Sequence, residues 1–145
     1  MHITRWGEYG ILCCMYLGEK HKITAAVGAA EIAKAQRIQL QYAQQILHRL
    51  RKGGIVRSIR GPRGGFKLIN EPDKISLRDI LYASEGNTFE LVCDTNPVKA
   101  EGCKANGADC RLSGVWQELK AAIDSLLGKR TLASVLGNGN GCPGC

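Results

Sequence analysis

Two helical patterns separated by a short turn constrain the fold of this chain more than any other feature. Residues 27–35 carry the first pattern, Arg37 falls at the turn, and residues 40–52 carry the second. A Gly-Gly pair directly follows the second pattern, and glycine is the residue that most often ends a helix. This spacing predicts a helix-turn-helix.

The second of these helices has an apolar face and a polar face. Its apolar residues recur at i, i+3, i+4 and i+7 and should point to the core: Ala43, Ile46, Leu47 and Leu50. The other faces carry side chains that can hydrogen-bond base edges and phosphates in a major groove. We therefore expect DNA contacts from Gln41, Tyr42, Gln44, His48 and Arg49.

A β-hairpin is predicted directly after this helix. Residues 55–69, "IVRSIRGPRGGFKLI", form two short β-like runs joined by a Gly/Pro-rich turn. The segment "GPRGG" could be only a turn, but Arg57, Arg60 and Arg63 on one hairpin after a helix-turn-helix indicate a wing that contacts phosphates or a minor groove.

The positive charge lies in the same half of the chain. Residues 1–70 hold 12 Lys/Arg against 3 Asp/Glu, whereas residues 71–145 hold 8 against 10. This asymmetry favours a polyanion as the partner of the first half, although charge alone would also fit a solvated basic surface. With the fold pattern, it predicts binding to double-stranded promoter DNA.

The start of the chain and its second half predict further helices. Residues 3–18 are apolar on more than one face, which predicts a buried helix in which Glu8 is the odd residue. Ser76 and Asp79 have the spacing of a capping box at the start of another helix. Residues 111–127 carry one long apolar stripe, and such a stripe needs a partner helix. Packing within the chain would satisfy it, but symmetric DNA readers favour a homodimer.

These elements predict a mainly α fold with a small β-hairpin wing, organised in four parts. They are a winged helix-turn-helix over 1–84, a cysteine-bearing loop over 85–110, a dimerisation helix and a short final helix over 111–136, and a flexible tail over 137–145. No apolar run approaches the ~20 residues of a membrane span, and the start lacks a signal-peptide pattern. We expect a cytoplasmic protein, where cysteines are more often ligands or thiols than disulfides.

Three of the seven cysteines stand together in the predicted loop. Cys93, Cys103 and Cys110 have the spacing Cys-x9-Cys-x6-Cys among Gly, Asn, Asp and Lys residues. Thiolates are soft ligands suited to iron-sulfur clusters or zinc, and a flexible loop lets three of them converge. Three unbound thiols, or a structural zinc with a fourth ligand, are the alternatives.

Several segments together resemble one family of regulators. "MHITRWGEYG", "LQYAQQILHRLRKGGIVRSIRGPRGGFKL", "CRLSGVW" and "TLASVL" are similar to the IscR/NsrR family of bacterial winged-helix transcription regulators, over roughly residues 1–136. The resemblance implies a homodimer that binds palindromic promoter DNA and carries an iron-sulfur cluster. It also implies DNA contacts at Gln41, Tyr42, Gln44 and the wing residue Arg60.

The resemblance leaves the fourth cluster ligand to be chosen. IscR-like regulators place a histidine three residues after the last cysteine, where this chain has Ser113. NsrR-like regulators use an acidic residue in the first helix of the other subunit, and Glu8 is at the matching position. A buried carboxylate must be paired or metal-bound. The alternative is that Glu8 points to solvent at a helix N-terminus.

We therefore predict a DNA-binding transcriptional regulator, not an enzyme, that senses redox state, nitric oxide or iron-sulfur status. The cluster would be held by Cys93, Cys103, Cys110 and Glu8, with 4Fe-4S favoured and 2Fe-2S the alternative. A cluster-free regulator that uses these cysteines for zinc binding or thiol-redox sensing is the second interpretation. A thiol-disulfide oxidoreductase based on the "CPGC" tail is disfavoured, because no βαβ pattern surrounds that pair.

Overall fold

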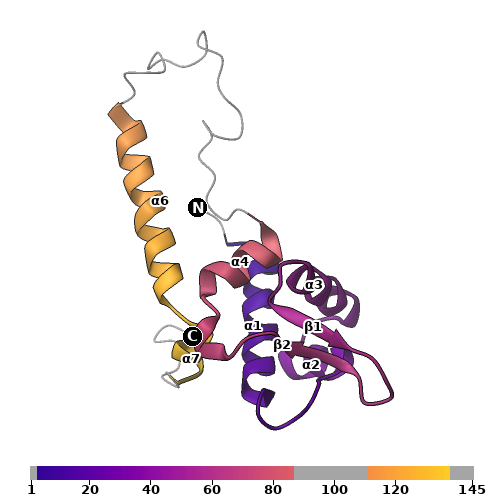
Figure 1. Ribbon diagram of the computed structural model, residues 1–145. Helices are drawn as coiled ribbons and strands as arrows, with labels where there is room; N and C mark the ends of the chain where they lie inside the picture. The colour runs from indigo at the N-terminus through magenta and orange to yellow at the C-terminus, as the bar shows by residue number, and fades with distance from the viewer. Residues whose placement is uncertain (1–2, 87–110, 138–145) are drawn as a thin grey trace.

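The helices and strands follow the predicted order. The structure is a computed structural model that describes residues 3–86 and 111–137. Its elements are α1 (Arg5–Lys20), α2 (Ala29–Gln36), α3 (Leu40–Lys52), β1 (Val56–Ile59), β2 (Gly65–Leu68), the 3-10 turn η1 (Pro72–Lys74), α4 (Leu77–Glu85), α6 (Arg111–Lys129) and α7 (Leu132–Gly137). This mainly helical fold with one antiparallel hairpin confirms the predicted class (Figure 1).

The helix-turn-helix consists of α2 and α3. Arg37, at the turn, adopts a left-handed conformation with φ 54°, and its N–H caps α2. On α3 the four apolar residues expected in the core are fully buried: Ala43, Ile46, Leu47 and Leu50. The periodicity therefore identified the core face of α3 correctly.

Helix α1 packs against α2, α3 and α4 (Figure 1). Its contact with α4 is close because glycines face that helix. A Cβ atom on Gly10 would lie 2.1 Å from the Ser84 hydroxyl oxygen, and one on Gly7 would lie 2.8 Å from Leu81. Glycine at these positions lets the two helix backbones approach each other.

The wing is tied to the helices by a third segment. Strands β1 and β2 pair in register from Val56 with Leu68 to Ile59 with Gly65. Val27, just before α2, exchanges two backbone hydrogen bonds with Phe66, with N···O distances of 2.9 and 2.8 Å. The sequence had predicted a two-stranded hairpin without this third contact.

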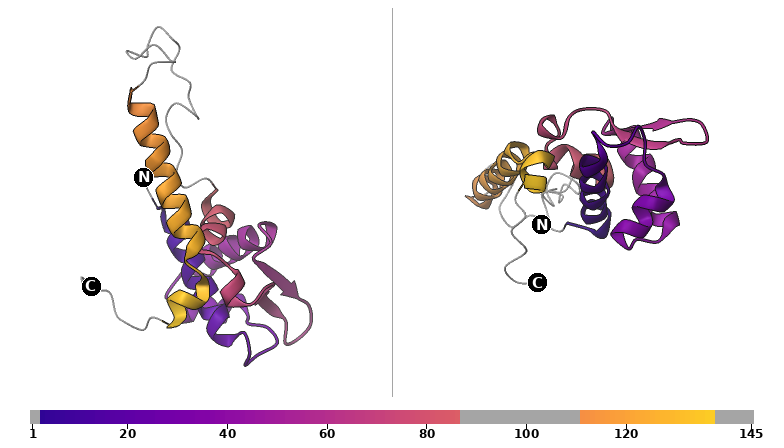
Figure 2. Two further views of the ribbon diagram at one scale, coloured as in Figure 1. Left: turned by 60° about the vertical axis from the view of Figure 1, so that its left-hand side comes forward. Right: turned by 90° about the horizontal axis from the view of Figure 1, so that it is seen from below.

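The long helix α6 joins the rest of the chain at its C-terminal end. The Leu77 N–H donates to the Arg130 carbonyl at 2.8 Å, and the Leu132 N–H donates to the Ile75 carbonyl at 2.8 Å. Leu132 of α7 is buried in the core. Figures 1 and 2 place α6 on the opposite side of the molecule from the tip of the wing. Within residues 3–86 and 111–137, no helix combines the length and apolarity needed to cross a membrane.

Candidate nucleic-acid interface

The outward face of α3 carries amide and imidazole side chains. Five exposed residues line a shallow groove on this face: Gln41, Gln44, Gln45, His48 and Arg49. Amides both donate and accept hydrogen bonds, and this is the chemistry that distinguishes base edges in a major groove. The opposite face of the same helix is fully buried, so α3 is held firmly behind this polar surface.

The wing presents the positive charge. Arg57, Arg60 and Arg63 are all exposed, and the loop between β1 and β2 projects beyond the helices (Figure 1). Guanidinium groups remain charged at all physiological pH values and suit bidentate contact with phosphate. The wing and the polar face of α3 together could therefore contact a polyanion.

Two residues expected to contact DNA make contacts inside the protein. The Tyr42 ring stacks on the Trp6 indole of α1 with centroids 4.6 Å apart, and it meets Tyr9 edge-on at 5.9 Å. The Arg49 guanidinium lies over the same indole at 4.2 Å. Arg49 Nη1 also donates a 2.9 Å hydrogen bond to the Ser84 carbonyl of α4.

Glu8 lies in the first turn of α1 and is exposed. The expectation that it is buried inside an apolar helix is therefore wrong for the single chain. The apolar side chains around it are only partly covered, so the polar Glu8 can face water between them. A carboxylate at a helix N-terminus is stabilised there by the helix dipole.

The cysteines divide into two groups. Cys93, Cys103 and Cys110, the expected cluster ligands, lie outside the described residues. Cys13 and Cys14 are fully buried in α1, and burial raises the pKa of the Cys13 thiol to about 12. In the described part of the chain, no three His, Cys, Asp or Glu residues gather into a possible metal site.

Comparison with known proteins assigns the chain to a family. The model of the Rrf2 family, described as iron-dependent transcriptional regulators, matches residues 3–138. The chain belongs to the Rrf2 family. The regulator IscR of Yersinia enterocolitica is 33% identical over 138 residues, which cover 95% of this chain and 80% of that protein.

Solved structures of Rrf2-type regulators have the same fold. The structure of CymR, described as the global cysteine regulator of B. subtilis, has a TM-score of 0.74 and 28% identity and covers 97% of this chain and 99% of its own. IscR of T. potens has a TM-score of 0.74 and 27% identity, with 97% and 89% covered. The Rrf2 assignment makes this chain a transcriptional regulator and confirms the predictions of DNA binding and of a non-enzyme.

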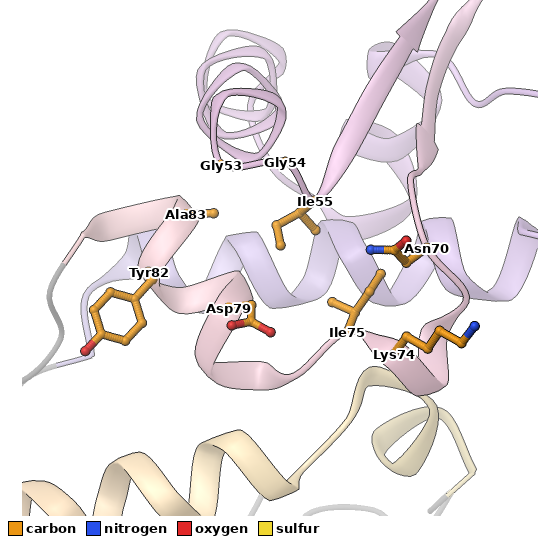
Figure 3. Close-up of a pocket in the computed structure, with 9 residues that line it drawn as sticks. All are labelled: Gly53, Gly54, Ile55, Asn70, Lys74, Ile75, Asp79, Tyr82 and Ala83. Carbon is orange, nitrogen blue, oxygen red and sulfur yellow. The ribbon is translucent and has the colours of Figure 1, made fainter.

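This chain also contains a cavity that is separate from the polar face of α3. A cavity of about 440 Å³ lies where the C-terminal end of α3 meets α4 and the segment after the wing (Figure 3). The Asp79 carboxylate at this cavity accepts a 2.6 Å hydrogen bond from the Ser76 hydroxyl as part of the capping box of α4. Lys74 extends away from the other lining residues. The Asp79 carboxylate thus serves the local fold at the start of α4.

Sequence reasoning missed the residues that join α1 to α3 and α4. In the sequence Trp6 is one of many apolar residues in the first helix, and nothing near Ser84 predicts a contact for it. Both are separated by more than 30 positions from the α3 residues that they contact. Periodicity along a single helix carries no information about such pairs.

Proposed function

We propose that this regulator reads double-stranded promoter DNA as a homodimer and senses redox state, nitric oxide or iron-sulfur status through a cluster. In this proposal α3 contacts bases through Gln41, Gln44 and His48, and the wing contacts the backbone through Arg57, Arg60 and Arg63. The observation that carries it is the contrast on α3, where a row of exposed amides lies opposite fully buried apolar residues.

The homodimer is supported by the exposed apolar face of α6. Its large apolar side chains remain between 42% and 59% exposed at five positions: Leu112, Val115, Trp116, Leu119 and Leu126. Such a continuous patch on a long helix marks an interaction surface. A second copy offers an identical helix, so α6 packed on α6 would cover both faces at once.

The cluster proposal rests on the donor set of this chain. Three thiolates at Cys93, Cys103 and Cys110 are soft ligands of the kind that hold iron-sulfur clusters. Glu8 is exposed on α1, so its carboxylate is accessible to a cluster held by a second subunit. A bound cluster would supply a group sensitive to oxidants and nitric oxide, and the family description as iron-dependent regulators agrees with it.

DNA binding is tested with an operator enriched from a random duplex pool by the wild-type protein. Gln44→Ala should change the base preference at one position in each half-site. Arg60→Ala should weaken binding with only modest sequence bias, because phosphate contacts carry little sequence information. Lys129→Ala, which removes an exposed cation at the C-terminal end of α6, is the control and should bind normally.

If Gln44→Ala and Arg60→Ala both bound DNA as the wild type does, α3 and the wing would both lie outside the DNA interface. A family regulator would then have to contact DNA through another surface.

The cluster is tested by anaerobic purification, with an absorbance spectrum and analysis of iron and sulfide. Cys103→Ala should abolish the cluster, whereas Glu8→Ala should give a labile or altered cluster and DNA binding that no longer responds to oxidant or nitric oxide. Glu19→Ala, an exposed glutamate on the same helix, is the matched control.

Iron-free protein would contradict the cluster proposal. Stoichiometric zinc, or metal-free protein whose DNA affinity depends on thiol oxidation, would instead favour the cluster-free regulator. A normal cluster and normal response in Glu8→Ala would remove Glu8 from the ligand set.

A further inference from the structure

The Trp6 indole of α1 contacts two side chains of α3. Tyr42 stacks on it at 4.6 Å with an interplanar angle of 28°, and the Arg49 guanidinium lies 4.2 Å from its centroid. Tyr42 and Arg49 are seven residues apart, which is two turns and about 10 Å along a helix. Both therefore lie on one side of α3, and both contact the same indole of α1.

Arg49 also connects α3 to α4. Its Nη1 donates to the Ser84 carbonyl, which is in the last turn of α4. Carbonyls in the last turn of a helix have no partner within the helix and carry its partial negative charge. One guanidinium N–H of Arg49 gives this carbonyl a partner, so Arg49 joins three helices through one side chain.

The first turn of α1 is itself fixed in place. The Thr4 hydroxyl accepts a 3.2 Å hydrogen bond from the Trp6 N–H, and the Thr4 N–H donates to Glu85 at 3.0 Å. The turn that carries the indole is thus attached to the end of α4. Trp6 contacts α3 from a fixed position and can set the orientation of that helix.

We propose that Arg49 is a positioning residue that acts through Trp6, and that it sets sequence discrimination without contacting DNA. This inference rests on the proposed function of α3 as the DNA-reading helix. Arg49 borders the groove lined by Gln41, Gln44, Gln45 and His48, and a DNA contact would be the simpler role for it. The Arg49 side chain is exposed, but the face of its guanidinium lies over the indole and one of its N–H groups donates to the Ser84 carbonyl. These two contacts hold the guanidinium against α1 and α4.

Positioning through Trp6 and direct contact with a DNA phosphate predict different salt dependence of DNA binding. A phosphate contact adds about 0.9 to the slope of log affinity against log salt concentration. Arg49→Met should therefore leave the slope for non-specific DNA unchanged and should lower the ratio of operator to scrambled-duplex affinity at least tenfold. Arg57→Met, at an exposed wing residue, is the matched control and should lower the slope by about 0.9 with little change in the ratio.

Charge-conserving and charge-neutral variants sharpen the test. Arg49→Lys keeps the charge but loses the planar group that stacks on the indole and donates to the carbonyl. The ratio of operator to scrambled-duplex affinity should therefore stay as low as in Arg49→Met. Trp6→Leu leaves every charge in place and should lower the ratio as Arg49→Met does. The double variant should lower the ratio by less than the product of the two single effects, because both changes remove the contact between Arg49 and Trp6. Trp6→Phe provides a milder change if Trp6→Leu does not fold by circular dichroism.

A slope lowered by about 0.9 in Arg49→Met, with recovery in Arg49→Lys, would make Arg49 a phosphate contact and overturn the inference. Unchanged slope and unchanged ratio in all Trp6 and Arg49 variants would overturn it as well. Failure of the wild-type protein to prefer its operator over the scrambled duplex would instead contradict the proposed function of α3.

Discussion

Helices α3 and α6 carry similar apolar stripes, but within residues 3–86 and 111–137 only the α3 stripe is covered. The four apolar residues of the α3 stripe are 0% exposed, whereas Leu112, Val115 and Leu126 of α6 are 54–59% exposed. Helix α3 is covered by α1, α2 and α4 from the same chain. Apolar periodicity therefore shows that a helix has a face to bury, but it does not show whether the partner is the same chain or another.

The first way to test this comparison is to shorten an isoleucine on each kind of surface. Ile46 of α3 is fully buried and Ile23 in the loop after α1 is 72% exposed. Ile46→Ala should lower the free energy of unfolding by roughly 2–5 kcal/mol through lost burial and a residual cavity. Ile23→Ala should change it by less than about 0.5 kcal/mol. Urea denaturation would measure both, and equal effects would contradict the assignment of the core.

The second test introduces a charge into the exposed stripe. Leu119→Glu should weaken dimerisation on the order of 100-fold, because a carboxylate would have to lose its hydration at the subunit contact. The secondary structure should persist, since Leu119 is already 42% exposed in the single chain. Analytical ultracentrifugation measures the association. Gln117→Glu, which adds the same charge at an exposed polar position on α6, is the control, and an unchanged Leu119→Glu dimer would place the interface elsewhere.

The third test compares two helical glycines. Gly10→Ala on α1 brings a Cβ to 2.1 Å from the Ser84 hydroxyl and should destabilise the fold by about 1–3 kcal/mol. Gly114→Ala on α6 meets no atom of the described chain within 4 Å and should stabilise the helix by up to about 1 kcal/mol. Thermal denaturation of both variants gives the sign. Destabilisation by Gly114→Ala would indicate close packing of that residue on a second copy.

The last test concerns the buried thiols of α1, which affect stability only at alkaline pH. Burial raises the pKa of Cys13 to about 12 from its ordinary value of 9.0, and it raises the pKa of Cys14 as well. The unfolded chain therefore loses these protons above about pH 9 while the folded chain keeps them. Stability should be complete below pH 9 and should fall as the pH rises towards 12, by up to ~1.4 kcal/mol per pH unit for each thiol. Denaturation of wild type and Cys13→Ala at pH 8 and 10 checks this, and identical slopes would contradict it.

The local elements of the fold could be predicted because each depends on residues close in sequence. The capping box of α4 needs only Ser76 and Asp79, and both of its hydrogen bonds are present. The core face of α3 needs only a 3.6-residue period. The wing needs only two β-like runs and a turn, although its link to Val27 depends on a residue nearly 40 positions away.

The contacts of α3 with α1 and α4 could not be predicted in this way, because they join residues far apart in the sequence. Arg49 has the type and the helix position of a DNA contact, and only the placement of Trp6 and Ser84 shows that its guanidinium is used inside the protein. Glu8 illustrates the reverse error. An apolar surrounding sequence suggested burial, but half-covered aromatic neighbours leave its carboxylate in water.

The backbone hydrogen bonds of Arg130 and Leu132 at the start of α4 fix the C-terminal end of α6. Helix α6 can therefore act as a lever whose fulcrum is that end. Nineteen helical residues extend about 28 Å from that fulcrum. A tilt of ~5° at the base would therefore carry the other end through about 2.5 Å. Cys110 immediately precedes that end in the sequence, so any force exerted by the cysteine segment on α6 would act with the full length of the arm.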